Sequence, residues 1–256
     1  MAITISRPAL LAVAAVLVLG AGLTAGADTT ADDAYAAGAP VTSAATPSSA
    51  APSSSPGKTL SPVGALFANG SHFCTASVVH SGAGDLVLTA AHCVTGGSGT
   101  ALSFAPGYHD GVAPVGMWPV TGVAVADGWT SSADPDLDFA FLTVHQAGNP
   151  ASLESLTGAN VLGTDRGFEH RITLTGYPDT TDSPVVCEGN TTRSDTYQLR
   201  VACPGFPDGT SGGPWVTDGT VIGVIGGYQL GGDTPDVSYS PYFDDDIAKL
   251  YASATG

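Results

Sequence analysis

The segment Asp208-Gly209-Thr210-Ser211-Gly212-Gly213-Pro214 places one serine among three glycines. Glycine adopts backbone conformations that other residues avoid, so a loop of this kind can gather several N–H groups around the serine. Such a loop is ordinarily only a turn. It also fits the pattern G-x-S-x-G, in which the serine is the nucleophile of α/β-hydrolases. The residues outside this segment decide between these interpretations.

The order of the histidines argues against the α/β-hydrolase fold. That fold expects its acid and its histidine after the serine. All six histidines precede Ser211, at positions 72, 80, 92, 109, 145 and 170. Only His92 has a distinctive context, because it ends the apolar run Leu88-Thr89-Ala90-Ala91-His92-Cys93.

A third segment, Leu137-Asp138-Phe139-Ala140-Phe141-Leu142, carries a lone aspartate at the start of an apolar run. A serine hydroxyl is a poor nucleophile at neutral pH and needs a base within hydrogen-bond reach. Histidine as a residue type suits this task, and a buried carboxylate can hold its imidazole in the required tautomer. Each segment alone favours a structural role, whereas their joint occurrence in this order favours chemistry. We predict that His92, Asp138 and Ser211 form a catalytic triad.

The glycines suggest where a developing negative charge would be stabilised. A tetrahedral oxyanion needs preorganised hydrogen-bond donors. The glycines around Ser211 allow two backbone N–H groups to point at one place, which a Cβ would hinder. We predict an oxyanion hole formed by the backbone N–H groups of Gly209 and Ser211.

The three segments resemble the motifs of the chymotrypsin/trypsin family of serine proteases. Thr89-Ala90-Ala91-His92-Cys93 is similar to the family's histidine motif, Asp138-Phe139-Ala140 to its aspartate motif, and Gly209 to Pro214 to its serine motif. The resemblance covers about 61 to 251, and Gly176-Tyr177-Pro178 is closer to the bacterial secreted branch of streptogrisins and glutamyl endopeptidases. It implies an all-β fold of two six-stranded antiparallel β-barrels with a C-terminal helix. It also implies a serine endopeptidase that works through an acyl-enzyme intermediate.

The chain departs from the family at two positions of the expected site. Thr210 stands where members activated by cleavage carry an aspartate, so we expect the site not to depend on that activation switch. Gly226 stands where many relatives carry a serine that donates a hydrogen bond to the triad aspartate. A catalytically silent homologue that binds a protein partner is therefore the rival hypothesis.

The resemblance implies a substrate pocket near Gly205, Asp208, Gly226, Gly227, Tyr228 and Asp236. Gly205 occupies the floor position where a trypsin has aspartate, so tryptic selectivity is not expected. Asp236 either faces the pocket or is a solvated turn residue after Pro235, and we favour the turn.

Short apolar runs separated by Gly, Asp and Pro favour many strands. One helix is expected at the end of the chain, where Asp244 to Asp246 suit a first turn and Ile247, Leu250 and Tyr251 share a face. The expected strands are Val63–Phe67, Cys74–Val79, Leu86–Ala90, Gly122–Ala126, Phe139–Val144, Ile172–Thr175, Pro184–Cys187, Tyr197–Val201 and Val221–Ile225.

The N-terminus predicts export. Arg7, the apolar run Ala9 to Leu23, and the small residues Ala25 and Ala27 form a signal peptide over 1–27. Residues 28–58 are rich in Ala, Ser, Pro and Thr and predict a disordered linker or propeptide. The protease domain is expected over 59–256, with an N-barrel over 59–150, a C-barrel over 151–242 and a helix over 243–254.

Export favours disulfides for the four cysteines. Three pairings can be drawn, and we favour the sequential one, Cys74 with Cys93 and Cys187 with Cys203.

Composition and charge exclude some classes of binding partner. The formal charge is −16, with seven basic residues, which argues against a nucleic-acid partner. No cluster has credible metal-ligand spacing, so neither a metal nor another cofactor is expected. We expect a polypeptide substrate, no membrane association after signal cleavage, and a monomer.

Overall fold

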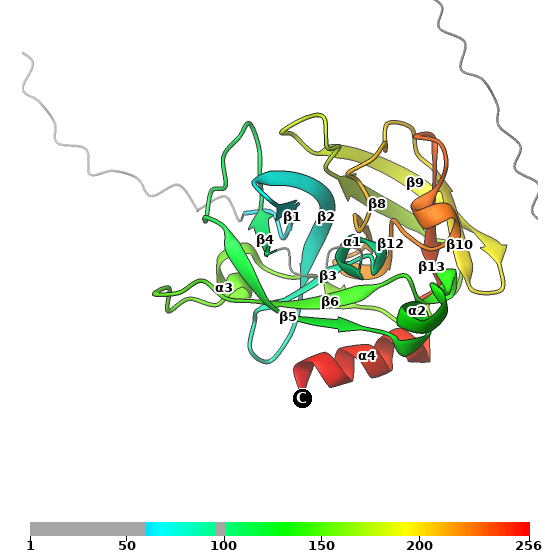
Figure 1. Ribbon diagram of the computed structural model, residues 1–256. Coiled ribbons are helices and arrows are strands. Elements are labelled where there is room, and N and C mark those ends of the chain that lie inside the picture. Colours follow the sequence, from blue (N-terminus) through cyan, green and yellow to red (C-terminus); the bar gives the residue numbers. More distant parts are fainter. Residues whose placement is uncertain (1–59, 96–100) are drawn as a thin grey trace, which may run out of the picture. The chain divides into compact units, whose positions relative to one another are not determined.

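The computed structural model describes residues 60–95 and 101–256 (Figure 1). The expected signal peptide over 1–27 and the expected linker or propeptide over 28–58 lie outside the described residues. None of the described helices is both long and apolar enough to cross a membrane.

The first half forms a closed barrel of six strands in the order β1-β2-β3-β6-β5-β4. Every neighbouring pair is antiparallel. The strands are β1 (Val63–Ala68), β2 (Ser71–Val79), β3 (Leu86–Thr89), β4 (Leu102–Pro106), β5 (Trp118–Val125) and β6 (Ala140–Val144). This closed barrel confirms the first of the two expected barrels.

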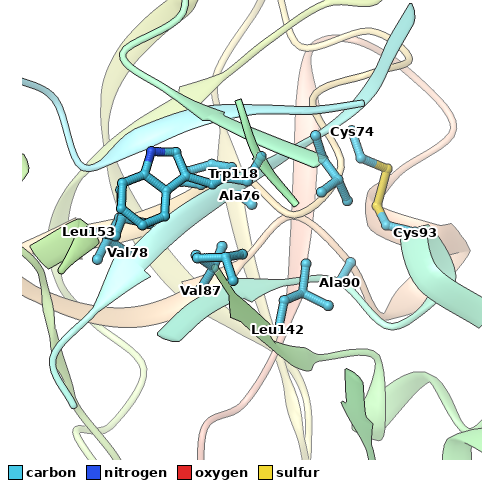
Figure 2. Close-up of a cluster of buried hydrophobic side chains, with 12 residues drawn as sticks. Cys74, Ala76, Val78, Val87, Ala90, Cys93, Trp118, Leu142 and Leu153 are labelled. Atoms are coloured by element: carbon cyan, nitrogen blue, oxygen red, sulfur yellow. A yellow bond between two sulfur atoms is a disulfide. The ribbon is translucent and has the colours of Figure 1, made fainter. Parts of the chain in front are cut away.

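Apolar side chains from these strands fill the barrel (Figure 2). Val87 and Leu142 are fully buried there, and Trp118 is almost so. Leu66 and Phe104 are fully buried in the same cluster. The disulfide between Cys74 and Cys93 lies among the same buried residues. It therefore ties the end of this core to the segment that begins at His92.

The second half forms one sheet of seven strands in the order β13-β10-β9-β8-β11-β12-β7. The strands are β7 (Val161–Leu162), β8 (Arg171–Gly176), β9 (Val185–Asp195), β10 (Gln198–Ala202), β11 (Pro214–Thr217), β12 (Thr220–Val224) and β13 (Val237–Pro241). The expected six antiparallel strands differ from this sheet, because the two-residue strand β7 adds a parallel edge to β12. The strand pairing does not join β13 to β7, so the pairing alone does not close a second barrel.

A second apolar cluster joins the two halves to the C-terminal helix. Val79 and Leu88 of the first barrel pack there with Val221 and Val224 of the second sheet. Helix α4 (Asp245–Thr255) adds the fully buried Ile247, and it lies beside β5 and β6 (Figure 1). The site described below lies between halves that share this core.

The predicted C-terminal helix is confirmed. Asp244 caps α4, because its carboxylate accepts the N–H of Asp246 at 2.8 Å. Leu250 and Tyr251 pack on the same cluster as Ile247. The described chain also has short helices that we did not predict: α1 (His92–Thr95), α2 (Asp127–Ser132), α3 (Leu153–Thr157), η1 (Pro135–Leu137) and η2 (Tyr228–Gly231).

Candidate active site

The pairing of β3 with β6 brings His92 and Asp138 together. Thr89 pairs with Ala140, so the ends of these strands deliver the histidine and the aspartate to one place. His92 Nδ1 lies 2.7 Å from Asp138 Oδ2, and the backbone N–H of His92 donates to Oδ1 at 2.9 Å. An ionised carboxylate at this place would only accept hydrogen bonds, and it would favour the tautomer that carries its proton on Nδ1 and leaves Nε2 unprotonated.

The carboxylate of Asp138 is completely buried and has a third donor. The backbone N–H of Gly227 donates to Asp138 Oδ2 at 2.8 Å. Gly226 is adjacent, and a Cβ there would lie 3.0 Å from the same oxygen. Gly226 has no side-chain donor, and the backbone N–H of the next residue, Gly227, donates to the carboxylate. Sequence reasoning placed Gly227 in the substrate pocket and missed the hydrogen bond from its N–H to Asp138.

Gln198 connects the two segments that surround this carboxylate. Its side chain is buried at the start of β10. Nε2 donates to Asp136 Oδ1 at 2.6 Å and to the carbonyl of Pro135 at 3.1 Å, while Oε1 accepts the N–H of Tyr228 at 3.0 Å. Gln198 thus joins the turn before Asp138 to the segment that contains Gly227. Nothing in the sequence singled it out.

Ser211 and His92 line the same cavity, whose volume is about 700 Å³. Ser211 is half-buried, and the His92 side chain is 16% exposed. Among the hydrogen bonds of the described residues, none joins the two side chains. Hydrogen bonds between a nucleophile and its base are often long in the absence of substrate.

The backbone N–H groups of Gly209 and Ser211 have no hydrogen-bond partner among the described residues. Their peptide planes are nevertheless fixed, because the carbonyl of Asp208 accepts from Asp179 N at 3.0 Å and that of Thr210 from Gly213 N at 3.0 Å. In a planar trans peptide the N–H points away from the C=O. The anchored carbonyls of Asp208 and Thr210 therefore fix the directions of the Gly209 and Ser211 N–H groups.

Of the residues expected to form the substrate pocket, only one lines this cavity. Asp208 lines the cavity, whereas Gly205, Gly226, Gly227, Tyr228 and Asp236 are not among its lining residues. Its lining instead includes Phe73, Phe206, Ile225 and the segment Gln229–Pro235. Two carboxylates, Asp208 and Asp233, line the cavity, and no lysine or arginine among the described residues does.

The hydroxyl of Thr210 is hydrogen-bonded within its own loop. It donates to the carbonyl of Pro207 at 2.6 Å, and the residue is buried. The position therefore holds no charge that would need a partner.

Both expected disulfides are present, Cys74–Cys93 and Cys187–Cys203. Cys74, His92 and Cys93 are the one group of described side chains whose atoms lie near enough to share a metal ion. Because both of its sulfurs are in the disulfide, this group offers no thiolate ligands.

The fold has counterparts in known proteins. The family model described as a trypsin-like peptidase domain matches residues 70–224, a stretch that contains His92, Asp138 and Ser211. No curated protein matches the chain by sequence.

Solved structures match more of the chain. The protease Anisep from Arthrobacter nicotinovorans is 26% identical with a TM-score of 0.67, and the match covers 77% of this chain and 97% of that one. The thermostable serine protease AL20 from an extremophilic microorganism is 24% identical with a TM-score of 0.67, over 76% and 96% of the two chains. A Glu endopeptidase is 19% identical with a TM-score of 0.62, over 77% and 92%.

The family model covers more than half of the 256 residues, and the solved structures share the fold across both halves of the site. The chain belongs to the trypsin-like peptidase domain family and is homologous to serine proteases.

Proposed function

We propose that the chain is a secreted serine endopeptidase with His92, Asp138 and Ser211 as its catalytic triad. The observation that carries this proposal is the buried Asp138 carboxylate bonded to His92 Nδ1 at 2.7 Å, with Ser211 in the same cavity as His92. A histidine fixed in this tautomer is suited to take a proton from a serine hydroxyl.

The proposed reaction has two halves. Ser211 Oγ attacks the peptide carbonyl while His92 Nε2 takes the hydroxyl proton, and the negative carbonyl oxygen accepts hydrogen bonds from the Gly209 and Ser211 amides. The C–N bond then breaks as His92 returns the proton to the leaving amine, which leaves Ser211 acylated. Water, deprotonated by His92, attacks the ester and releases the second product and free Ser211.

Secretion is part of the proposal. It rests on the signal peptide that the sequence predicts over 1–27 and on the two disulfides, which are typical of oxidising compartments. We propose that 59–256 is the protease domain, divided near residue 150, and that the protein acts as a monomer on polypeptides.

We also infer that the second sheet curls into a barrel. Support comes from two hydrogen bonds that link the end of β12 to β13. The N–H of Gly226 donates to the carbonyl of Tyr239 at 3.1 Å, and that of Val224 to Ser240 Oγ at 2.9 Å.

Hydrolysis of an unfolded polypeptide tests the proposal. The wild-type protein is expected to cleave it, while Ser211→Ala, His92→Ala and Asp138→Asn each lose at least about 1,000-fold in kcat/KM. Ser131→Ala is the matched control, because Ser131 is exposed on α2 and does not line the cavity. Cleavage that persists unchanged in the Ser211→Ala protein would contradict the proposal.

The rival function is partner binding without catalysis. A human protein with the same fold, described as heparin binding, is 14% identical with a TM-score of 0.55. A chain with a formal charge of −16 would repel a polyanion such as heparin, so we do not propose heparin as a ligand of this chain. Absence of cleavage in a folded wild-type protein would favour the binding function.

A further inference from the structure

One threonine of the first barrel makes hydrogen bonds to the serine loop, residues 208–214, and does not line the cavity. Thr75 lies on β2, next to Cys74, and is fully buried. Its hydroxyl donates to the carbonyl of Gly209 at 3.0 Å and accepts the N–H of Tyr177 at 2.8 Å. Its backbone N–H donates to the carbonyl of Ser211 at 2.7 Å. Thr75 does not line the cavity, so any effect on the reaction passes through the loop.

The carbonyl that the hydroxyl binds belongs to a particular peptide plane. The plane between residues 208 and 209 carries the Gly209 N–H, and the plane between 210 and 211 carries the Ser211 N–H. The peptide plane between 209 and 210 connects these two planes. Its orientation therefore determines the angle between the Gly209 N–H and the Ser211 N–H. Thr75 Oγ1 anchors this middle plane, together with a 3.2 Å bond from Thr210 N to Pro207 O.

We propose that Thr75 is a positioning residue for oxyanion stabilisation, an inference that rests on the function proposed above. Its hydroxyl fixes the relative direction of the Gly209 and Ser211 N–H groups before substrate arrives. Preorganised donors stabilise the oxyanion because they need no rearrangement during the reaction. The hydroxyl is suited to this place because it donates and accepts at once, which valine of the same shape does not.

The second sheet offers a matched control. Thr191 is also buried, and its hydroxyl also donates to a carbonyl, that of Phe168 at 2.7 Å, and accepts a backbone N–H, that of His170 at 2.9 Å. Thr191 does not line the cavity. Thr191→Val therefore removes the same kind of hydrogen bonds as Thr75→Val, at a residue whose hydroxyl does not bind residues 208–214.

The experiment compares wild type, Thr75→Val, Thr75→Ser and Thr191→Val by peptide hydrolysis, by thermal unfolding and by affinity for a peptide boronic acid. In the boronic acid adduct Ser211 Oγ bonds to boron, His92 takes the serine proton, and the tetrahedral boronate carries the negative charge.

Thr75→Val is expected to lower kcat about 10- to 100-fold with KM changed less than about threefold, the scale expected from a small misplacement of catalytic groups. It should weaken boronic acid binding by a similar factor. Thr75→Ser should restore both, and Thr191→Val should lower the unfolding temperature without changing kcat.

A Thr75→Val protein with the kcat and boronic acid affinity of wild type would overturn the inference. An equal loss of kcat in Thr191→Val would also overturn it, because the effect would then reflect stability alone. Thr75→Ala is a second variant without the hydroxyl, with the same expectations, should Thr75→Val not fold. A folded wild type that neither cleaves peptide nor binds the boronic acid would instead contradict the proposed function.

Discussion

At the scale of single residues, Gly209 is a position where the surrounding backbone leaves no room for a side chain. Its φ is +90°, and a Cβ would lie 2.2 Å from Asp179 N and 2.7 Å from the carbonyl of Tyr177. Asp179 N is the donor that anchors the carbonyl of Asp208. A side chain at this position would therefore disturb the hydrogen bond that orients the Gly209 N–H.

We predict that Gly209→Ala lowers kcat about 100-fold or more, the scale of losing one oxyanion donor. Gly219→Ala is the control, because Gly219 also has a positive φ, +74°, but its Cβ would meet nothing within 4 Å. The control should lose some stability and retain its kcat. Peptide hydrolysis and thermal unfolding of both variants check this, and equal kcat values for the two would refute the explanation.

Gln198 gives a second prediction at this scale. Gln198→Leu removes three hydrogen bonds that hold the turn before Asp138 to Tyr228, so kcat should fall about tenfold through misplacement of Asp138. Gln146 makes a similar set of bonds, to the carbonyls of Val115 and Met117 and from Asn149, and does not line the cavity. Gln146→Leu should leave kcat unchanged. Steady-state hydrolysis measures both, and a Gln198→Leu protein as active as wild type would rule out this role.

Local sequence predicted some parts of the site and not others. His92, Asp138 and Ser211 could be proposed because each stands in a distinctive short segment. The partners that hold them are distant in sequence: Thr75 and Gly209 are 134 residues apart, and Gly227 and Asp138 are 89 apart. Such contacts depend on how the two halves meet, which no short segment encodes.

At the scale of elements, the predicted strands coincide with short apolar runs, whereas the missed strands β11 and β13 do not stand out as such runs. In β13, Ser238 and Ser240 are buried, so polar side chains occupy inward positions. β11 begins with Pro214 at the end of the serine loop, where a turn was expected. In η2, Gln229 and Leu230 have φ values of 53° and 55°, a conformation that is uncommon for residues other than glycine. The segment Gln229–Pro235 was consequently absent from the expected pocket.

Helix α4 gives the prediction at this scale. Ile247 is fully buried with Phe139 and Phe243 in the cluster that joins the two halves. Ile247→Ala should lower the free energy of unfolding by roughly 2–5 kcal/mol, because it leaves a cavity there. Ser253→Ala, at an exposed position of the same helix, should change it by less than about 0.5 kcal/mol. Denaturant unfolding compares the two, and equal values would show that α4 does not contribute to the core.

At the scale of the whole molecule, the chain has 23 acidic and 7 basic residues. The carboxylates of Asp208 and Asp233, which line the cavity, add negative charge there, in keeping with the net negative charge of the chain. A protein of strong net charge attracts oppositely charged partners over distances that salt shortens. Charge therefore bears on the rate of substrate encounter and not on the fold.

We predict that raising the ionic strength from about 0.01 M to 0.5 M lowers kcat/KM for a cationic polypeptide several-fold, since the screening length falls well below the size of the protein. A neutral peptide with the same cleaved bond should be affected little. Initial-rate measurements at low substrate concentration compare the two. Equal salt dependence would exclude electrostatic attraction as the cause.

The proposed function requires that Ser211 be an activated nucleophile, and covalent labelling measures this reactivity. The purified protein would be treated with a fluorophosphonate, which transfers its phosphonyl group to an activated serine and releases fluoride. Digestion and mass spectrometry would then locate the adduct. We predict one adduct, on Ser211, that disappears in His92→Ala. An adduct on a different residue, or none on the folded protein, would contradict it.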